Sequence, residues 1–569
     1  MAGEALVPTT RWLKAFTAQS AGKDVIAGLV LSILLVPQAM AYAQLAGLPP
    51  QMGLFAALTP PILYFFFGTS PFVSVGPVAL VSLVISEAVG NTALEAQAGA
   101  AIIGIEAGIL LVALGAFGLG RLVNFISEPV LLGFTAAAAF LIAASQLPTL
   151  LGIDVPRAGN LPAALSALWG GIGQLRPVTA VIGAGALIAL LLAHRYAPAI
   201  LWKIGVKPPF RLALAKSLPL LVIVLAGWIA ATCAAEVPTV ESVSGGLPHV
   251  FDSFAEPFVW FNLLPSGLAV AIIIFVTATA VAKALAGEDR SNLNTSREAV
   301  ALGAGNIAAS LTGGYAVGAS LSRSALAGDS GGRTPFASVV ASLAIVAVLF
   351  FLAPLLAYLP KTALAALVIS AVFGLINLRE IRAVWDHDRV EVAIVAASFL
   401  ATLLLGVRLG LAIGALLGLA YFLWFSSVPR VTRIGTDDGG TSFRSIERDA
   451  VELTTLPNLV VRIDRSIYFA NAAYVEEEVF NRLAEHEGLT GLVLDMSAVN
   501  DIDSSGLAML RRMVTRLKSM GISLHFAAVH EPVAESLEKL DSSVCRFHRT
   551  VGQALEGCGI QLDEDIAPT

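Results

Sequence analysis

Two short segments hold the residues whose types and spacing suggest chemistry inside an otherwise apolar chain. Residues 71–77 form a β-prone run closed by a Gly-Pro pair, and residues 313–319 form a glycine-rich run followed by Ser320. Glycine before proline is typical of a helix start, and serine is a favoured N-cap. The sequence therefore predicts two half-length helices, one with Pro77 as its first residue and one capped by Ser320 and closed by Gly328.

Arg323 and the two predicted helix starts form a candidate anion site. A helix start exposes amide N–H groups and the positive end of the helix dipole, so two starts that face each other would attract an anion. Arg323 adds a full charge and paired donors that suit an oxyanion. The alternative is an arginine that pairs with a structural carboxylate or reaches the membrane surface. Because extended backbone at this depth must pair within the protein, we expect the two runs to meet as short strands.

Gln38 and Tyr42 are further candidate ligands in the first long apolar segment. They are four residues apart and fall on one face of a helix, next to Pro37, which cannot donate to the carbonyl of Ile33. An amide and a phenol can orient an oxyanion without adding charge. The alternative is that these two groups only join one helix to another.

A transporter that couples an anion to a proton or a sodium ion needs an acidic group inside the membrane. The candidates are Glu87, Glu106 and Glu128, and each lies near the end of a predicted span, where solvation of a helix end is the alternative explanation. The span 263–286 offers only Thr277, Thr279 and Lys283 as notable polar groups. The coupling ion, H⁺ or Na⁺, therefore stays open.

The composition indicates which class of protein positions these groups. Hydrophobic residues make up 56% of the chain, charged residues 13%, and the mean hydropathy is +0.80, which excludes a cytosolic enzyme. Charged residues are roughly 10% of the chain before Arg430 and roughly 25% after it, and the excess acid lies in the tail. This pattern predicts a membrane body with a soluble tail and argues against a nucleic-acid partner. No metal site, cofactor site or nucleophile–base set is recognisable, and the three cysteines are expected to be apolar fillers.

Apolar runs of spanning length recur through the body and predict a polytopic α-helical membrane protein. With two shorter or proline-interrupted elements in each half, they give about fourteen crossings. Pro77 lies 53 residues after Asp24 and Ser320 lies 54 residues after Ser266, which indicates an internal repeat with a broken helix in each half. The runs are 25–41, 102–118, 129–147, 178–193, 218–235, 263–286, 300–312, 336–359, 363–376, 390–405 and 409–425.

Lysine and arginine in the short loops predict the orientation. The basic segments 194–216 and 379–389 should face the cytoplasm, and the acidic loop 236–256 should face outward. With an even number of crossings, both termini lie inside. The predicted parts are a cytoplasmic segment 1–23 without signal-peptide features, a transport domain 24–428, a linker 429–445, a soluble domain 446–560 and a tail 561–569.

The soluble domain alternates strand and helix patterns and is predicted to be a small α/β domain. The strands are expected at 459–463, 491–494 and 522–527, and the helices at 472–485 and 505–518. Ser504 follows Asp503 at the start of the second helix. It is either a regulatory phosphorylation site or part of an ordinary helix cap.

Four motifs together resemble the SulP sulfate permease family, whose relatives include the animal solute-carrier 26 anion exchangers. The resemblance covers nearly the whole chain. It implies fourteen transmembrane segments as 7+7 inverted repeats, a mobile core domain against a gate domain, elevator-like alternating access, homodimers and a cytoplasmic STAS domain. The motifs are VPQAMAYAQLAGLPPQMGLFAAL (36–58), FGTSPFVSVGPVALVSL (67–83), GASLSRSALAGDSGGRT (318–334) and DMSAVNDIDSSGLAML (495–510).

The resemblance also implies an anion site and raises one departure from the family pattern. Proton-coupled members carry a glutamate, and a sodium-coupled bicarbonate member an aspartate, in the eighth span near the place where this chain has Thr277. This departure favours exchange, uniport or another coupling residue. The implied substrate-binding residues are Gln38, Tyr42, Val78, Ala79, Leu321, Ser322 and Arg323, with Thr277 beside them.

These features predict a secondary transporter of a small inorganic oxyanion in a bacterial inner membrane. Sulfate is the first candidate, because the run GPVALVSL resembles that of plant and bacterial sulfate transporters, and bicarbonate or a C4-dicarboxylate is the runner-up. An uncoupled channel-like anion conductor and a receptor that signals through its tail are the other classes. The expected partners are the anion, a coupling ion, membrane lipid and a second copy of the chain.

Overall fold

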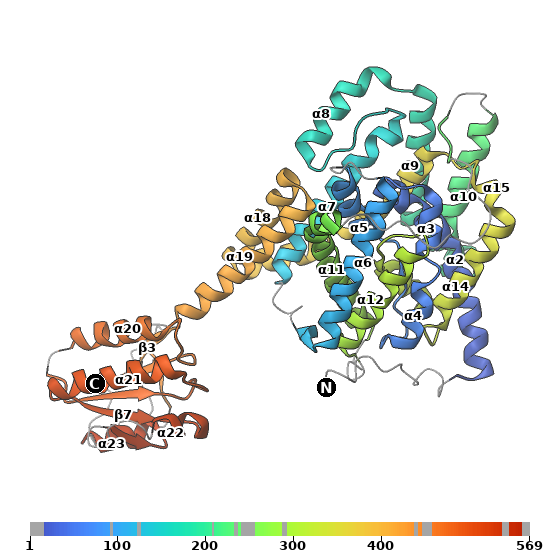
Figure 1. Ribbon diagram of the computed structural model, residues 1–569. Coiled ribbons are helices and arrows are strands. Elements are labelled where there is room, and N and C mark those ends of the chain that lie inside the picture. Colours follow the sequence, from blue (N-terminus) through green and yellow to red (C-terminus); the bar gives the residue numbers. More distant parts are fainter. Residues whose placement is uncertain are drawn as a thin grey trace. The chain divides into compact units, whose positions relative to one another are not determined.

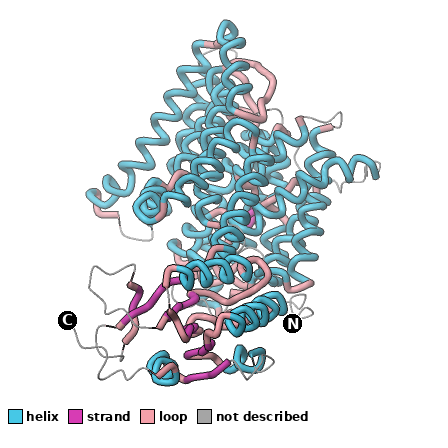
Figure 2. The backbone as a smooth tube through the Cα atoms, turned by 90° about the vertical axis from the view of Figure 1, so that its left-hand side faces the viewer, coloured by secondary structure: helices cyan, strands magenta, loops and turns pink. Residues whose placement is uncertain are grey.

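The computed structural model describes residues 16–90, 95–121, 127–206, 210–232, 237–240, 257–286, 293–436, 442–446, 458–486, 488–537 and 545–559. The chain divides into two compact units, Met1–Gly418 and Leu419–Thr569. The first unit is almost entirely helical, whereas the second holds a sheet (Figures 1 and 2). Cys233 and most of the acidic loop 236–256 lie outside the described residues.

The helices of the first unit confirm a polytopic membrane fold. Ten helical segments in the described part of the chain are long and apolar enough to cross a membrane. The shorter helix α5, of 11 residues, is also apolar. A π-helical turn, Val348–Leu352, joins α14 to α15.

The bounds of these helices are α2 (Ala18–Ala46), α3 (Pro50–Ala56), α4 (Pro60–Phe67), α5 (Ala79–Val89), α6 (Ala96–Ala116), α7 (Glu128–Leu151), α8 (Leu161–Gly171), α9 (Pro177–Lys203), α10 (Phe210–Thr232), α11 (Pro257–Leu285), α12 (Thr295–Leu311), α13 (Leu321–Asp329), α14 (Phe336–Ala347), α15 (Ala353–Leu356), α16 (Lys361–Val372), α17 (Leu378–His387), α18 (Arg389–Leu405) and α19 (Val407–Ser427). Two 3₁₀ turns, Ile172–Gln174 and Phe373–Leu375, follow α8 and α16.

The two halves of the first unit are related as inverted repeats. The first helix of each half, α2 or α11, has 29 residues. Each half then places a two-residue strand, β1 (Val75–Gly76) or β2 (Gly318–Ala319), directly before its half-length helix, α5 or α13. Because β1 and β2 pair in antiparallel fashion, the two half-length helices leave the strand pair in opposite directions. The predicted meeting of the two extended runs is confirmed.

Two buried carboxylates fasten one half to the other. Asp24 of α2 accepts hydrogen bonds from the backbone of Arg333 (2.6 Å) and from the backbone and hydroxyl of Thr334. Glu298 of α12 accepts from the Tyr64 hydroxyl (2.8 Å) and from the backbone of Thr69, 2.7 Å away. Carboxylates buried in this way are stabilised only when donors surround them, so these contacts fix the loops on either side of the strand pair.

Glycines bring α6 and α12 into close contact. A Cβ atom on Gly108 would lie 2.8 Å from the carbonyl oxygen of Gly303, and a Cβ atom on Gly303 would lie 2.6 Å from the carbonyl oxygen of Gly108. Small residues that let two helix backbones approach are the usual means of helix association in membranes. The position of α6 is therefore closely set by α12.

The second unit is an α/β domain with a six-stranded sheet in the order β4-β3-β5-β6-β7-β8. Strands β5 to β8 are parallel, and β3 is antiparallel to β4 and β5. The elements are β3 (Val431–Gly435), β4 (Arg444–Ser445), β5 (Leu459–Ile463), α20 (Ala472–Ala484), β6 (Gly491–Asp495), α21 (Ser504–Ser519), β7 (Ser523–Ala527), α22 (Glu531–Leu537), β8 (Cys545–His548) and α23 (Val551–Gly557).

Alternation along the central strands places helices on both faces of this sheet. Val461 and Leu494 belong to one apolar cluster, with residues of α20, α21 and α22, whereas Val460 and Val493 belong to a second cluster, with residues of α23. The predicted strands and helices between Leu459 and Ala527 are confirmed within a residue or so. Strands β3 and β8 and helices α22 and α23 were not predicted.

A stacked histidine pair makes the second unit sensitive to acid. The rings of His525 on β7 and His548 on β8 lie 5.2 Å apart and nearly parallel, with Nδ1 of His525 3.1 Å from Nε2 of His548. Burial, together with the charges of His548 and Arg546, lowers the pKa of His525 to about 4. The unfolded chain therefore binds more protons than the folded domain between about pH 6.5 and pH 4, and acidification through this range destabilises the fold.

We expect the equilibrium constant for opening of β7 and β8 to be roughly tenfold larger at pH 5 than at pH 7.5. Hydrogen–deuterium exchange of the full chain, corrected for the intrinsic pH dependence of amide exchange, measures it. A His525→Asn variant should lose most of this pH dependence. Equal protection of wild-type β7 at both pH values would contradict the assignment.

Candidate functional site

The strand pair in the first unit is held by polar side chains that satisfy its backbone. Ser320 donates its backbone N–H to the carbonyl of Ser74 (3.3 Å), and the Ser74 N–H donates to the hydroxyl of Ser324 (2.9 Å). The Asn306 side chain bonds both backbone groups of Val317, at 3.0 and 2.8 Å. Asn306 and Ser324 are fully buried. Sequence reasoning missed both, although an asparagine within an apolar span is a visible signal.

Both half-length helices begin at this strand pair, with corrected ends. Helix α5 begins at Ala79, because Val78 is still extended (φ −137°, ψ 146°). The prediction that Pro77 is its first residue was therefore wrong. Helix α13 begins at Leu321, and Ser320 is its N-cap, as predicted. It ends at Asp329 with Ser330 as the C-cap, so the prediction of Gly328 as the cap was wrong. No side chain caps α5, which leaves its first amide groups open to a ligand.

Arg323 is fully buried beneath the two helix starts. Its Nη1 donates to the carbonyl of Pro77 (2.9 Å) and lies 3.5 Å from the side-chain oxygen of Gln38. Its Nε and Nη2 have no hydrogen-bond partner among the described residues. Among the described residues, Arg323 pairs with no carboxylate and does not reach the surface. Its partners are a backbone carbonyl and a side-chain amide. The guanidinium is therefore held through Nη1, and its Nε and Nη2 can donate to a ligand.

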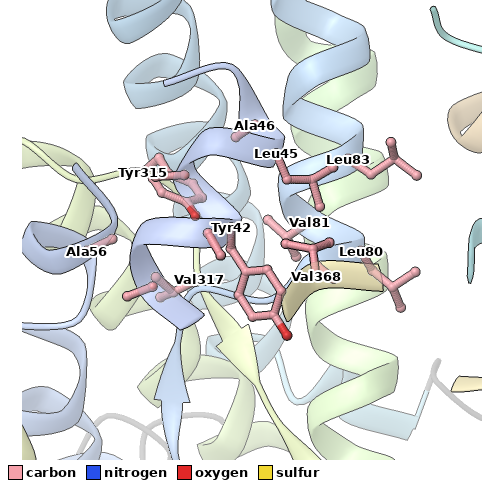
Figure 3. Close-up of a cluster of buried hydrophobic side chains, with 14 of the residues drawn as sticks. Tyr42, Leu45, Ala46, Ala56, Leu80, Val81, Leu83, Tyr315, Val317 and Val368 are labelled. Carbon is pink, nitrogen blue, oxygen red and sulfur yellow. The ribbon is translucent and has the colours of Figure 1, made fainter. Parts of the chain in front are cut away.

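Gly76 and the helix α2 complete the surroundings of the guanidinium. A Cβ atom on Gly76 would lie 3.4 Å from Nη2 of Arg323, so this glycine leaves room for the arginine and its ligand. Gln38 and Tyr42 are both buried on α2. Figure 3 shows Tyr42 among buried side chains that include Leu80 of α5 and Val317.

The remaining predicted ligands surround the helix starts. Val78 is half-buried and Ala79 is buried at the start of α5, whereas Leu321 and Ser322 are exposed at the start of α13. Four of these residues can offer backbone amides, since N–H groups at a helix start lack intrahelical acceptors. The structure thus brings Gln38, Arg323 and both helix starts together at one place.

Thr277 makes no described hydrogen bond to Arg323 or Gln38. Its hydroxyl donates to the carbonyl of Ile273 on the same helix, α11, at 2.6 Å. Its side chain lines a small apolar pocket with residues of α7 and with Leu411 of α19. No described contact connects Thr277 to Arg323 or Gln38, so the structure does not place it with these ligands.

The three candidate acids have three different environments. Glu128 is exposed at the start of α7, as expected of a helix end. Glu87 accepts a hydrogen bond from the backbone of Val407 (3.1 Å) and so caps the start of α19. Glu106 is 5% exposed in the middle of α6, so the alternative explanation of a solvated helix end does not hold for it. The helix begins six residues earlier than the predicted span, which moves Glu106 to the interior.

Ser504 in the second unit is exposed as the first residue of α21. The cap is Asp503, whose carboxylate accepts from the backbone of Gly506 (2.8 Å) and of Phe469 (2.8 Å). Ser504 is thus not the capping residue, and its phosphorylation stays a prediction.

The fold and site define a polytopic membrane protein of inverted repeats whose half-length helices meet at a buried arginine. The family model for the sulfate permease family matches residues 22–398, and the model for the STAS domain matches residues 449–554. The chain belongs to the sulfate permease family and carries a C-terminal STAS domain, as its motifs predicted.

Similar proteins include plant transporters of known name. The chain is 32% identical to the chloroplastic sulfate transporter 4.1 of Arabidopsis thaliana, over 94% of this chain and 79% of the relative. It is 28% identical to sulfate transporter 3.1 of the same plant, over 98% of this chain and 87% of the relative.

Two solved structures share the fold. Murine solute carrier 26 family member A9, an anion transporter in its inward-facing state, matches with a TM-score of 0.87 at 19% identity, over 97% of this chain and 94% of that one. The transmembrane domain of a cyanobacterium bicarbonate transporter matches with a TM-score of 0.59 at 19% identity, over 71% of this chain and 98% of that one.

Proposed function

We propose that this protein is a secondary active transporter of a small inorganic oxyanion, with sulfate as the substrate. The observation that carries the proposal is Arg323, fully buried between the starts of α5 and α13 with two donor nitrogens unpartnered among the described residues. A buried charge without a compensating partner is costly in a membrane protein. An oxyanion bound at Nη2 and Nε would supply that compensation.

The backbone contributes the rest of the site. The open amide groups at the starts of α5 and α13 point their dipoles toward the strand pair, and both favour negative charge. Gln38 holds Nη1 of Arg323 and can present its own N–H₂ group to an oxygen of the anion. Tyr42, buried four residues after Gln38 on α2, is a further candidate ligand. The site thus binds by charge and hydrogen bonding, with no need for a metal.

Sulfate is favoured over other anions by the named relatives, several of which are sulfate transporters. Bicarbonate is the second candidate, because a structure with the same fold is titled a bicarbonate transporter. A site made of dipoles and one arginine selects charge more strongly than shape, so a C4-dicarboxylate belongs to the same comparison.

The transport cycle we propose is alternating access by an elevator-like motion of a core domain against a gate domain. The inverted repeats support it, since transporters built from such repeats move one part against another around a site near the midplane. We further propose a homodimer in a bacterial inner membrane, with both termini in the cytoplasm and the domain boundaries predicted from the sequence. A channel-like conductor would differ by passing current without a counter-substrate.

Uptake of labelled sulfate into proteoliposomes tests this function. We expect saturable uptake that excess unlabelled sulfate suppresses and that bicarbonate and succinate suppress less. Matched liposomes without protein provide the background. Saturable uptake of bicarbonate or succinate without sulfate uptake would show that the substrate is that anion and not sulfate. Absence of uptake of all three anions would refute the proposal.

A further inference from the structure

Glu106 is a buried carboxyl group that the anion site does not use. It lies near the middle of α6 and is 5% exposed, and its Oε2 has no hydrogen-bond partner among the described residues. An ionised carboxylate with an unpartnered oxygen in a membrane interior costs several kcal/mol, and a proton removes most of that cost. In the conformation described, this position therefore suits a neutral carboxylic acid.

The seat of this carboxyl group is formed by a glycine of the neighbouring helix. A Cβ atom on Gly267 of α11 would lie 2.5 Å from Oε2 of Glu106 and 2.7 Å from its Cβ atom. Any larger residue at 267 would displace the acid, so α11 is shaped to accept it. The seat belongs to the same helix as Thr277, the residue that stands where family relatives are expected to carry an acid.

The surroundings favour a proton over a metal cation as the ligand. A hard cation needs several oxygen ligands at once, and the described residues place no group of acidic or histidine side chains that could hold a metal ion. The surface that faces Oε2 is a glycine, which has no side-chain oxygen. A lone carboxyl group with no second acidic or histidine side chain described beside it suits a proton better than a metal cation.

Charged groups on the packed helices are engaged elsewhere or lie at helix ends. On α5, Glu87 bonds to Val407, and on α12 Glu298 bonds to Tyr64 and Thr69. Lys283 of α11 and Arg297 of α12 lie near the ends of their helices. A further cation that contacts α11 is Arg408 of α19, whose Nη1 lies 3.3 Å from the hydroxyl of Ser266, the residue before Gly267.

The contact between Arg408 and Ser266 indicates where water could reach the carboxyl group of Glu106. Ser266 is buried under Arg408, so the seat of Glu106 lies one residue from a junction between α11 and α19. In our proposal, movement of α11 relative to α19 hydrates this seat. An acid that is enclosed in one conformation and hydrated in another can take up a proton on one side and release it on the other.

We propose that Glu106 is the proton-binding residue that couples anion uptake to a proton gradient. The inference rests on the proposed function, because coupling has meaning only if the protein moves an anion. Glu106 then takes the role that an acid at position 277 would otherwise have, and the anion stays at Arg323. Protonation at Glu106 adds one positive charge to the transported complex and partly offsets the charge of the anion.

The test uses purified full-length protein in liposomes with the membrane potential held at zero. Sulfate exchange against internal sulfate measures the anion site, and sulfate accumulation under an inward pH gradient measures coupling. For one proton per anion, one pH unit supports about tenfold accumulation. We expect wild type to accumulate sulfate, Glu106→Gln to exchange sulfate without accumulating it, and the exposed-acid control Glu128→Gln to behave as wild type.

Each other outcome is decisive. Two outcomes would overturn the role of Glu106 but not the transport function. One is sulfate accumulation by Glu106→Gln, and the other is a wild type that exchanges sulfate but does not accumulate it under the pH gradient. Absence of wild-type exchange refutes the transport function itself. Should Glu106→Gln lose exchange as well, Glu106→Asp decides: a shifted pH midpoint of accumulation supports proton binding at 106, and an unshifted midpoint overturns it.

Discussion

Replacing Arg323 with alanine abolishes saturable sulfate uptake while the protein still folds and inserts. The substitution removes the buried charge of Arg323, together with the two donor nitrogens that have no partner among the described residues. Hydrogen bonds to a charged group are worth about 1.5–3 kcal/mol each, so loss of two predicts at least ~100-fold weaker uptake at low substrate concentration. Initial rates over a range of sulfate concentrations measure this loss.

Arg323→Lys is the matched variant for this prediction. It keeps the charge but loses the planar pair of donors, so we expect activity between that of wild type and Arg323→Ala. Fluorescence-detected size exclusion shows whether each variant remains folded. If folded Arg323→Ala transported sulfate with wild-type kinetics, the anion would bind somewhere else.

Replacing Glu298 with alanine destabilises the first unit rather than the anion site itself. The carboxylate of Glu298 accepts from the Tyr64 hydroxyl and from the backbone of Thr69 and Ser70. Alanine leaves these buried donors without an acceptor, at a cost of about 1–3 kcal/mol for each group. We expect a loss of at least ~3 kcal/mol in the free energy of unfolding, which corresponds to roughly 4 °C in melting temperature.

Thermal unfolding in detergent, followed by size exclusion after heating, measures this change. Glu298→Gln keeps one acceptor oxygen and should lose less, and Glu128→Ala, at an exposed helix end, should melt as wild type does. A Glu298→Ala protein with wild-type stability would show that the loop 68–70 does not depend on this carboxylate.

The half-length helices could be predicted because their signals are local. Glycine, proline and serine at fixed positions mark a helix start whatever the rest of the chain does, and Ser320 is indeed the N-cap of α13. The pairing of β1 with β2 followed from the need to satisfy backbone in a membrane. The first residue of α5 was misplaced by two positions, since proline fixes one dihedral angle but does not force Val78 into a helical conformation.

The contacts between distant parts could not be predicted. Asp24 and Glu298 find their donors 309 and 229 residues away along the chain. A sequence shows a carboxylate but not the loop that will surround it, so Glu298 received no role. Glu106 was misjudged for a related reason: its burial depends on where α6 begins and on the glycine of α11 beside it, and neither is visible in the residues around it.

The place of Thr277 beside the anion stays a prediction. Its position in the eighth span suggested a place beside the anion, whereas its hydroxyl bonds its own helix and its side chain lines an apolar pocket. A threonine in a membrane helix commonly satisfies itself in this way, through the carbonyl four residues earlier. The acid absent from this position is supplied, in our proposal, by Glu106 on α6.

A cryo-electron microscopy map of the protein with saturating sulfate, compared with a sulfate-free map, tests the central claim most directly. The account predicts sulfate-dependent density about 3 Å from Nη2 of Arg323 and from the first amide groups of α5 and α13. Unchanged density at the two helix starts, with sulfate bound elsewhere in the first unit, would contradict it.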